Sequence, residues 1–561
     1  LRGTLYDEEG RLINKIELIP KRSEDPVYQG YIYIVEDLWN IQSVDLMLSS
    51  GAMKQPGLDS LYIRQVHVPV QEPDVWRIFS QTIRFRAGLF GFRLAGDFTG
   101  IYRDYDLNPA FEHRFFDNEV FRVNEGANEK DQLFWDSIRP IPLTLEEKID
   151  YVRKDSLQLI RETKEYKDSV DRRSNRFTPL NLVFGYAYSN SYKRKYITMG
   201  SPVSTIQYNT VQGFNGDLQF NFRKEFDEYN MRWLEIAPRL SYGLADKRLR
   251  ARAGFTYRFN RTNRATLNIE GGIDAFQFNP ENPITKTQNT GSTLFFRNNH
   301  MKIYDKAFGK ITLSRELVNG VFLSAGVEYS KRSPLVNNTD YSWRREGERV
   351  FTSNDPTDPE NFEPSFEEHN ALITSFGLRL RYKQRYITYP GRKFIQGSRL
   401  PDLVIHYDKG ISGNNSGANF DKLTLQLVEN YVPVGVLGYL EFNLESGFFL
   451  NKDKLYFMDY KHFNGNRPKV GNPFKYMNAF KRLPYYEFST NSNYLEGHFQ
   501  HHFEGFWLDK IPGLRKLGWY TVLGAAFLYT PEKKEYVELT LGLDNIGFGV
   551  LRLFRVDLVL H

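Results

Sequence analysis

The stretch GVLGYLEFNLESGFFL, residues 435–450, alternates between two kinds of side chain. One parity is apolar and comprises Val436, Leu440, Phe442, Leu444, Phe448 and Leu450. The other carries Glu441, Asn443 and Glu445. A period of two residues is that of a β-strand, whose successive side chains point to opposite faces. An apolar face that continues for about ten residues, opposite a charged one, is typical of a strand in a transmembrane β-barrel.

The same pattern recurs along the chain in ARAGFTYRF (251–259), LITSFGLRLRY (372–382) and YVELTLGL (536–543). It predicts that Phe255, Phe376, Phe442 and Leu541 face lipid, and that Arg258, Arg379 and Glu441 face the lumen. A soluble β-sandwich also has one apolar and one polar sheet face. However, a soluble sandwich rarely sustains the pattern over nearly 400 residues in one domain.

Composition excludes several other classes of protein. The 561 residues contain no run of 18 apolar residues, so a helical membrane protein is excluded. Cysteine is absent, which rules out disulfides and thiol catalysis. The 74 basic and 68 acidic residues are too balanced to indicate a nucleic-acid partner. No signal peptide is visible at Leu1.

Three regions follow from the distribution of these patterns. Residues 1–105 read as short alternating strands and predict a β-sheet domain. Residues 106–175 form a connector with one long helix at about 144–171, in which Thr144 and Glu147 make a capping box. Residues 176–561 are the predicted antiparallel barrel. The fold class is therefore all-β.

The strand count predicts that the barrel is incomplete. Fifteen strands can be assigned between residue 180 and His561, and bacterial single-chain barrels have an even number. An open barrel edge in lipid leaves backbone groups unpaired. We therefore expect sixteen strands, with the last one following His561 and closing onto residues 180–190.

Four segments carry a family resemblance: FWDSIRPIPLTLEEKIDYVRKDSL, YKDSVDRRSNRFTPLNLVFGYAYSNSYKRKYI, YNTVQGFNG and GLDNIGFGVLRLFRVDLVL. They are similar to a family of uncharacterised outer-membrane β-barrels with a carboxypeptidase-regulatory-like N-terminal domain. The resemblance implies an outer-membrane location in a Gram-negative bacterium, with the N-terminal domain in the periplasm. It also implies a short final strand beyond His561.

The family in turn resembles, more distantly, the outer-membrane assembly and two-partner secretion barrels, whose sixth outer loop folds into the lumen. YKHFNGNRPKVGNPFKYMNAF (460–480) lies at that loop's position. We expect loop 451–490 to obstruct the lumen, with Arg467 and Lys469 among the basic residues that meet Glu441 and Glu445. The superfamily's Arg-Gly-aromatic tip is Arg467-Pro468 here, and TVLGAAFLYT (521–530) lacks the acid that pairs with it. The charged lock is thus expected to be absent or rebuilt.

Three functions agree with this barrel. The first is outer-membrane biogenesis or export, handling protein, lipoprotein or lipid. Residues 10–21 and 28–49 resemble the curved sheets of periplasmic lipoprotein and lipid carriers, and an ordinary β module that positions partners fits them equally well. The others are a structural subunit of a larger outer-membrane complex and a gated channel. No catalytic motif is present, and His498 and His502 on one strand lie about 13 Å apart, too far to share a metal. We expect no enzyme activity, metal or cofactor, and as partners the lipid bilayer and other outer-membrane or periplasmic proteins.

Overall fold

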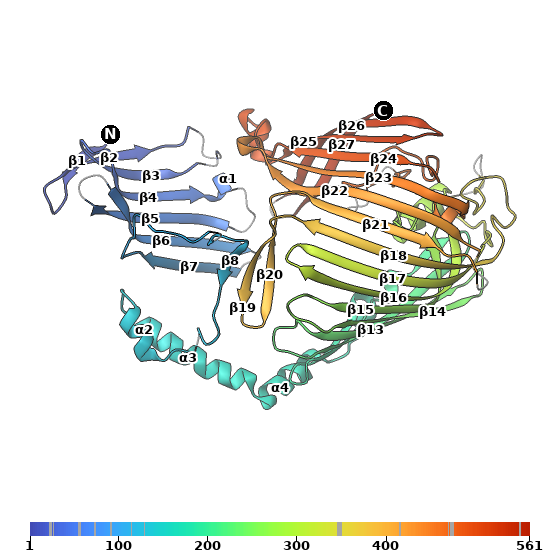
Figure 1. Ribbon diagram of the computed structural model, residues 1–561, viewed down its shortest axis with the longest axis horizontal. Helices are drawn as coiled ribbons and strands as arrows, with labels where there is room; N and C mark the ends of the chain where they lie inside the picture. The colour runs from blue at the N-terminus through green and yellow to red at the C-terminus, as the bar shows by residue number, and fades with distance from the viewer. Residues whose placement is uncertain are drawn as a thin grey trace.

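The computed structural model describes residues 1–561 except 22–24, 26, 54–57, 72–74, 90–91, 114, 128, 345–349, 414–416, 469, 472–475 and 549–550. It contains a seven-stranded sheet, a connector and a closed β-barrel (Figure 1). None of the helices in the described ranges is both long enough and apolar enough to cross a membrane.

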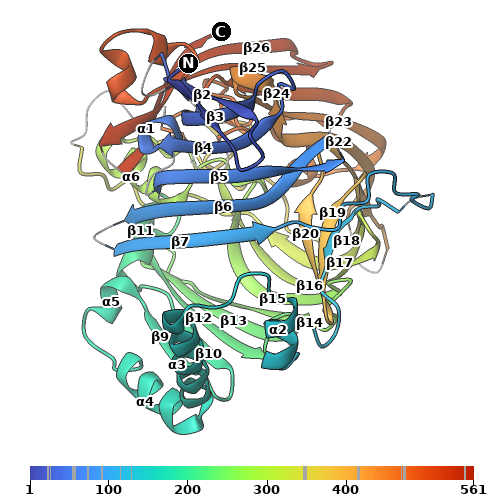
Figure 2. The ribbon, with the colours of Figure 1, turned by 90° about the vertical axis from the view of Figure 1, so that its left-hand side faces the viewer.

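The N-terminal sheet is an antiparallel meander in which each strand pairs with the next in the sequence. Its strands are β1 (Gly3–Tyr6), β2 (Leu12–Leu18), β3 (Gln29–Val35), β4 (Ile41–Ser49), β5 (Leu58–Gln71), β6 (Val75–Leu89) and β7 (Phe92–Ile101), with the short helix α1 (Ser50–Met53) after β4. Its buried core is small, and Ile13, Val35 and Trp76 form it. Figure 2 shows this sheet in front of one end of the barrel.

The connector contains β8 (Glu119–Arg122) and three helices, α2 (Gln132–Ile138), α3 (Leu145–Glu162) and α4 (Lys164–Ser174). The predicted capping box of Thr144 and Glu147 begins α3. The predicted single helix is interrupted at Thr163. The extended backbone of this residue ends α3, and its side chain accepts a hydrogen bond from the Tyr166 N–H at the start of α4.

The barrel region starts with α5 (Asn181–Phe184) and ends at Leu560. Its wall strands are β9 (Tyr186–Asn190), β10 (Lys195–Met199), β11 (Gln207–Asn209), β12 (Gly213–Glu225), β13 (Trp233–Gly243), β14 (Leu249–Arg258), β15 (Thr266–Gln277), β16 (Ile303–Val318), β17 (Val321–Ser333), β18 (His369–Arg381), β21 (Asp402–Gly410), β22 (Asn419–Pro433), β23 (Tyr439–Lys454), β24 (Tyr494–His502), β25 (Tyr520–Thr530), β26 (Lys534–Phe548) and β27 (Leu551–Leu560). Neighbouring wall strands pair antiparallel in sequence order, except that β10 and β11 both pair with β12.

The two faces of the wall alternate as the sequence predicts. On β26, Val537, Leu539 and Leu541 are about half exposed on the outside, whereas Glu538 and Thr540 are buried on the inside. Phe376 on β18 is likewise exposed. The outside of the barrel is therefore an apolar belt suited to lipid, and the inside is polar.

The prediction of a missing last strand is wrong, because the barrel closes within this chain and β27 neighbours β9 directly. The overlooked strand lies at residues 195–209. Its two parts, β10 and β11, pair with different halves of β12 and share one position in the wall. The described strands thus fill sixteen positions. Gly200 and Pro202 interrupt this strand and hide its period of two.

The two ends of the barrel differ. At the loop end lie the long connections 278–302, 334–368 and 455–493, of which the first contains α6 (Lys286–Phe296). The opposite turn end has mostly short connections and faces the N-terminal sheet (Figure 1). One turn-end connection, between β18 and β21, carries an additional hairpin, β19 (Arg385–Tyr389) and β20 (Arg392–Gly397). We call this hairpin the strap.

Candidate functional site

The candidate site is the lumen, because connections from both ends of the barrel enter it or cross its mouth. From the loop end, residues 455–493 contact inward-facing side chains of several wall strands. We call these residues the plug. The plug begins at the end of β23 and returns to the wall at β24.

Two inward carboxylates next to the plug's own base hold its first part. The Lys461 ammonium lies between Glu445 of β23 and Glu496 of β24, with an Nζ–O distance of 3.0 Å to Glu496. Tyr494 donates a hydrogen bond to Glu445 at 2.7 Å, and His498 pairs with Glu496 at 2.9 Å. These carboxylates are shielded from solvent but fully partnered, which removes most of the cost of burying charge.

Glu538 of β26 holds the later part of the plug through the plug's backbone. Its carboxylate accepts hydrogen bonds from the N–H groups of Lys481 and Arg482, at 2.6 and 2.7 Å, and from the Tyr536 hydroxyl at 2.7 Å. Glu538 has no exposed surface. Beside it, Phe480 is fully buried in a cluster with Phe463, Leu483, Tyr494, Leu528 and Tyr536. The plug is thus packed against the wall and not merely lying in solvent.

Two further contacts attach the plug to other parts of the wall. Asp459 forms a bidentate, almost fully buried ion pair with Arg332 of β17, at 2.7 and 2.8 Å. At its far side, the Tyr476 hydroxyl bonds to Asp557 of β27, which Arg555 also contacts at 2.9 Å. Since β17 and β27 are well separated around the wall, the plug spans the lumen.

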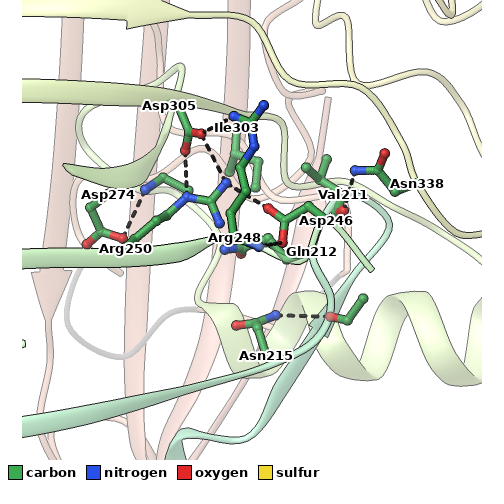
Figure 3. A network of polar contacts seen from close by, with 12 residues as sticks. Val211, Gln212, Asn215, Asp246, Arg248, Arg250, Asp274, Ile303, Asp305 and Asn338 are labelled. Carbon is green, nitrogen blue, oxygen red and sulfur yellow. Dashed lines mark hydrogen bonds and ion pairs between the residues drawn. The ribbon is translucent and has the colours of Figure 1, made fainter. Parts of the chain in front are cut away.

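The other long connections pack beside the plug at the loop end. Figure 3 shows Asp305 of β16 between Arg248 and Arg250, with Nε of the buried Arg250 2.6 Å from Asp305 and its Nη2 2.7 Å from Asp246. This network fixes the loop ends of neighbouring strands. In the same view, Asn338 donates to the carbonyl of Val211 at 2.8 Å, which ties connection 334–368 to the turn between β11 and β12.

The strap lies across the turn end. The buried Glu316 of β16 accepts hydrogen bonds from Lys393 of β20 at 2.9 Å, from the Gln384 amide at 2.7 Å and from the Gly320 N–H at 3.0 Å. Near the tip of the strap, the Arg392 guanidinium stacks 3.9 Å from the ring centre of Tyr229, in the turn between β12 and β13. The strap therefore reaches from the β18 and β21 side of the mouth to turns of other strands.

Among the described residues, the connector touches the barrel at two places. Strand β8 pairs in parallel with β19 of the strap, with Tyr386 opposite Glu119 and Thr388 opposite Arg122. Asp171 of α4 is buried and accepts hydrogen bonds from the Ser191 N–H at 2.7 Å and the Ser189 hydroxyl at 3.1 Å. These serines flank the end of β9, the first wall strand.

The sequence-predicted lumen residues are placed as follows. Glu445 contacts the plug, but its basic partner is Lys461 rather than a residue at the tip. Glu441 pairs with His502 of the neighbouring strand at 3.0 Å. Arg467 lies close to His300 and Tyr485, away from both acids. Lys469 lies outside the described residues.

Sequence reasoning did not single out Glu538, Glu316 or the strap. The strap had a readable signal, because RYITYPGRKFIQG (385–397) places a Pro-Gly turn between two alternating runs. The Arg–Asp lock of the superfamily is not found among the described contacts of Arg467. In this chain the later part of the plug is held by Glu538 through two backbone N–H groups.

Comparison with known proteins gives a family and similarities to solved structures. A solved structure similar to the chain is the crystal structure of BamA from Haemophilus ducreyi lacking POTRA domains 1–3. It is 9% identical, with 70% of this chain and 73% of that chain covered and a TM-score of 0.36, a similarity that does not extend to mechanism. A search of curated proteins found no match. A model described as a family of unknown function (DUF5686) matches residues 1–105, and the model of its C-terminal domain matches residues 180–543. Because this second match alone covers more than half of the chain, the protein belongs to the DUF5686 family.

Proposed function

We propose that the protein is an outer-membrane β-barrel that acts in outer-membrane biogenesis or export of proteins, lipoproteins or lipids. In this proposal the turn end and the N-terminal sheet lie in the periplasm. The supporting observation is that the plug spans the lumen at the loop end, while the strap crosses part of the mouth at the turn end. A sixteen-strand barrel is wide enough for an aqueous channel unless something fills it.

The contacts that obstruct the lumen are of kinds that resist displacement. Arg332 and Asp459 form a bidentate ion pair away from water, and separating such a pair leaves two uncompensated charges. Glu538 satisfies two backbone N–H groups that would otherwise be buried without a partner. A barrel closed in this way is poorly suited to free diffusion of solutes.

The wall offers a second reason for a role other than a pore. Strand β9 has five residues and its neighbour β27 has ten, so β9 can pair with only part of β27. The pairing of β9 with residues 195–199 places it in the turn-end half of the wall. Strand β9 is therefore too short to pair with the loop-end half of β27. A polypeptide or lipid passing between lumen and bilayer would meet least resistance there.

Conductance and depletion together test the proposal. Purified full-length protein in planar bilayers should show no large, steady conductance, and depletion in cells should reduce surface lipoproteins or assembled barrels. A porin-like conductance would contradict the closed lumen and favour the gated channel. If the protein gives no conductance and its depletion causes the loss of one specific partner complex, a structural subunit is favoured instead.

The structural-subunit alternative has an observation of its own. β7 is the last strand of the N-terminal sheet, and its Phe92, Leu94 and Phe98 are 81, 63 and 62% exposed. An exposed edge strand with apolar side chains is suited to pairing with another chain. Copurification from native membranes, compared between wild type and Leu94→Lys, would test whether this edge binds a partner.

A further inference from the structure

A cavity of about 650 Å³ lies inside the turn end of the barrel, beside the strap. Inward-facing residues of β16, β17, β18 and β21 line it, and Ile395 of the strap closes part of one side. Its volume is in the range of about 300–1,000 Å³ that small-molecule sites occupy. It is separate from the plug, whose contacts lie toward the loop end.

Two of the charged groups around this cavity are each neutralised by an ion pair with another residue. Glu316 is the acid among its lining residues, and Lys393 of the strap holds its carboxylate. Arg381 makes two hydrogen bonds to Asp402, at 2.8 and 2.6 Å. Neither Glu316 nor Arg381 therefore leaves a net charge for the cavity.

Two arginines have no close acid partner among the described residues. The Arg379 guanidinium reaches Asp402 only at 4.0 Å, both oxygens of that carboxylate accept hydrogen bonds from Arg381, and half of the Arg379 side chain is exposed. Arg264, in the turn before β15, has no ion pair with any acid in the described part of the chain. Arg315 also borders the cavity, but it shares the outward parity of Ile311 and Leu313.

We propose that this cavity binds a phosphate-bearing ligand, whose oxygens lie between the guanidinium groups of Arg264 and Arg379. A guanidinium presents parallel N–H donors that match an oxyanion. A carboxylate has two oxygens, and one guanidinium occupies both of them. A phosphate group has enough oxygens to accept hydrogen bonds from two guanidinium groups. A polar lumen with low-dielectric walls strengthens the attraction by concentrating the field of the two charges. The phosphate comes either from a soluble phosphomonoester or from a lipid headgroup.

Calorimetric titration of the purified full-length protein in a non-ionic detergent tests the proposal with two probes. The first is glycerol 3-phosphate, and the second is dihexanoylphosphatidic acid. Binding of the first alone assigns the site to soluble phosphates. Binding of the second, alone or much more tightly, assigns it to a lipid headgroup.

Variants locate the binding in this cavity. Arg379→Gln and Arg264→Gln should each weaken binding by about tenfold or more, since each removes a charge-assisted hydrogen-bonded pair. Arg315→Gln, which removes the same charge from the outward face, should leave the affinity unchanged. Arg379→Lys keeps the charge without the fork and should give an intermediate loss. The proposal is overturned if neither probe binds at millimolar concentration, or if Arg264→Gln and Arg379→Gln bind as tightly as Arg315→Gln. Heat-modifiable migration on gels confirms that each variant is folded.

Discussion

Replacing Glu538 with glutamine is the sharpest perturbation of the plug. The carboxylate accepts two backbone N–H groups and one hydroxyl, all within 2.7 Å, and has no exposed surface. Glutamine keeps one acceptor oxygen, so at least one donor of the plug loses its partner and the remaining bonds lose their charge. A buried unsatisfied donor costs about 1–3 kcal/mol. The population of the displaced plug should therefore rise about 5- to 150-fold.

Single-channel recording in planar bilayers measures that population directly, as the fraction of time in a conducting state. The matched control is Glu270→Gln. Glu270 is an inward-facing acid of β15 whose partner is Asn268 on its own strand. The control changes the charge of the lumen equally, so it should alter ion selectivity but not opening frequency. If folded Glu538→Gln opens no more often than wild type and Glu270→Gln, the plug is not held by this carboxylate and the reasoning fails.

Three other perturbations test the wall, the connector and the turn end. Leu541→Arg on the lipid face should cost about 2–4 kcal/mol, measured by urea titration of the heat-modifiable form, while Gln219→Arg on the lumen face should cost much less. Asp171→Ala removes the acceptor that docks α4 on the β9 end, so α4 should be cleaved faster by limited proteolysis at unchanged barrel stability. Burial alone would raise the pKa of Asp227, but three backbone N–H groups of its turn and Arg261 outweigh burial, and the pKa lies below its usual value. Its stabilising contribution should be complete above about pH 4 and disappear as the pH falls through the folded pKa, and Asp227→Asn should flatten the dependence of Tm on pH in this range.

The strands of the wall could be predicted from the sequence because each of them has one face toward lipid and one face toward the polar lumen. Lipid outside and a polar lumen inside impose the period of two on β14, β18, β23 and β26, and the structure follows it. The strand at 195–209 escaped because it does not cross the wall in one piece. Gly200 and Pro202 break its ladder, and only β10 and β11 remain as short pieces on either side. Because this one strand was overlooked, the sequence predicted an open barrel of fifteen strands, whereas the barrel is closed.

The contacts of the lumen could be predicted only in part. That inward acids such as Glu445 would meet a basic loop followed from charge. Which basic residue they meet depends on how the plug is packed against the wall, and no local pattern reports that packing. Arg467 and Lys469 were expected to meet the acids, yet Lys461 at the base of the plug lies between Glu445 and Glu496. Glu538 binds backbone N–H groups. Almost every residue has such a group, so the sequence does not indicate which of them a carboxylate will bind.

The connector joins the N-terminal sheet to the barrel at the strap and at the first wall strand. Through β8 it pairs with β19 of the strap, which crosses part of the turn-end mouth. Through Asp171 it is fixed to the end of β9, the shortest partner at the seam with β27. Between these contacts the chain has the break at Thr163, where α3 and α4 meet and a change of backbone angle disturbs neither helix. A load applied to the sheet is thus divided between the strap and the seam strand β9. The plug is anchored to β17 and β26, but it also meets the other seam strand, through Tyr476 and Asp557 of β27. A displacement of the seam would therefore reach the plug through Asp557, whereas the contacts that hold the strap, with Glu316 and Tyr229, do not involve the plug.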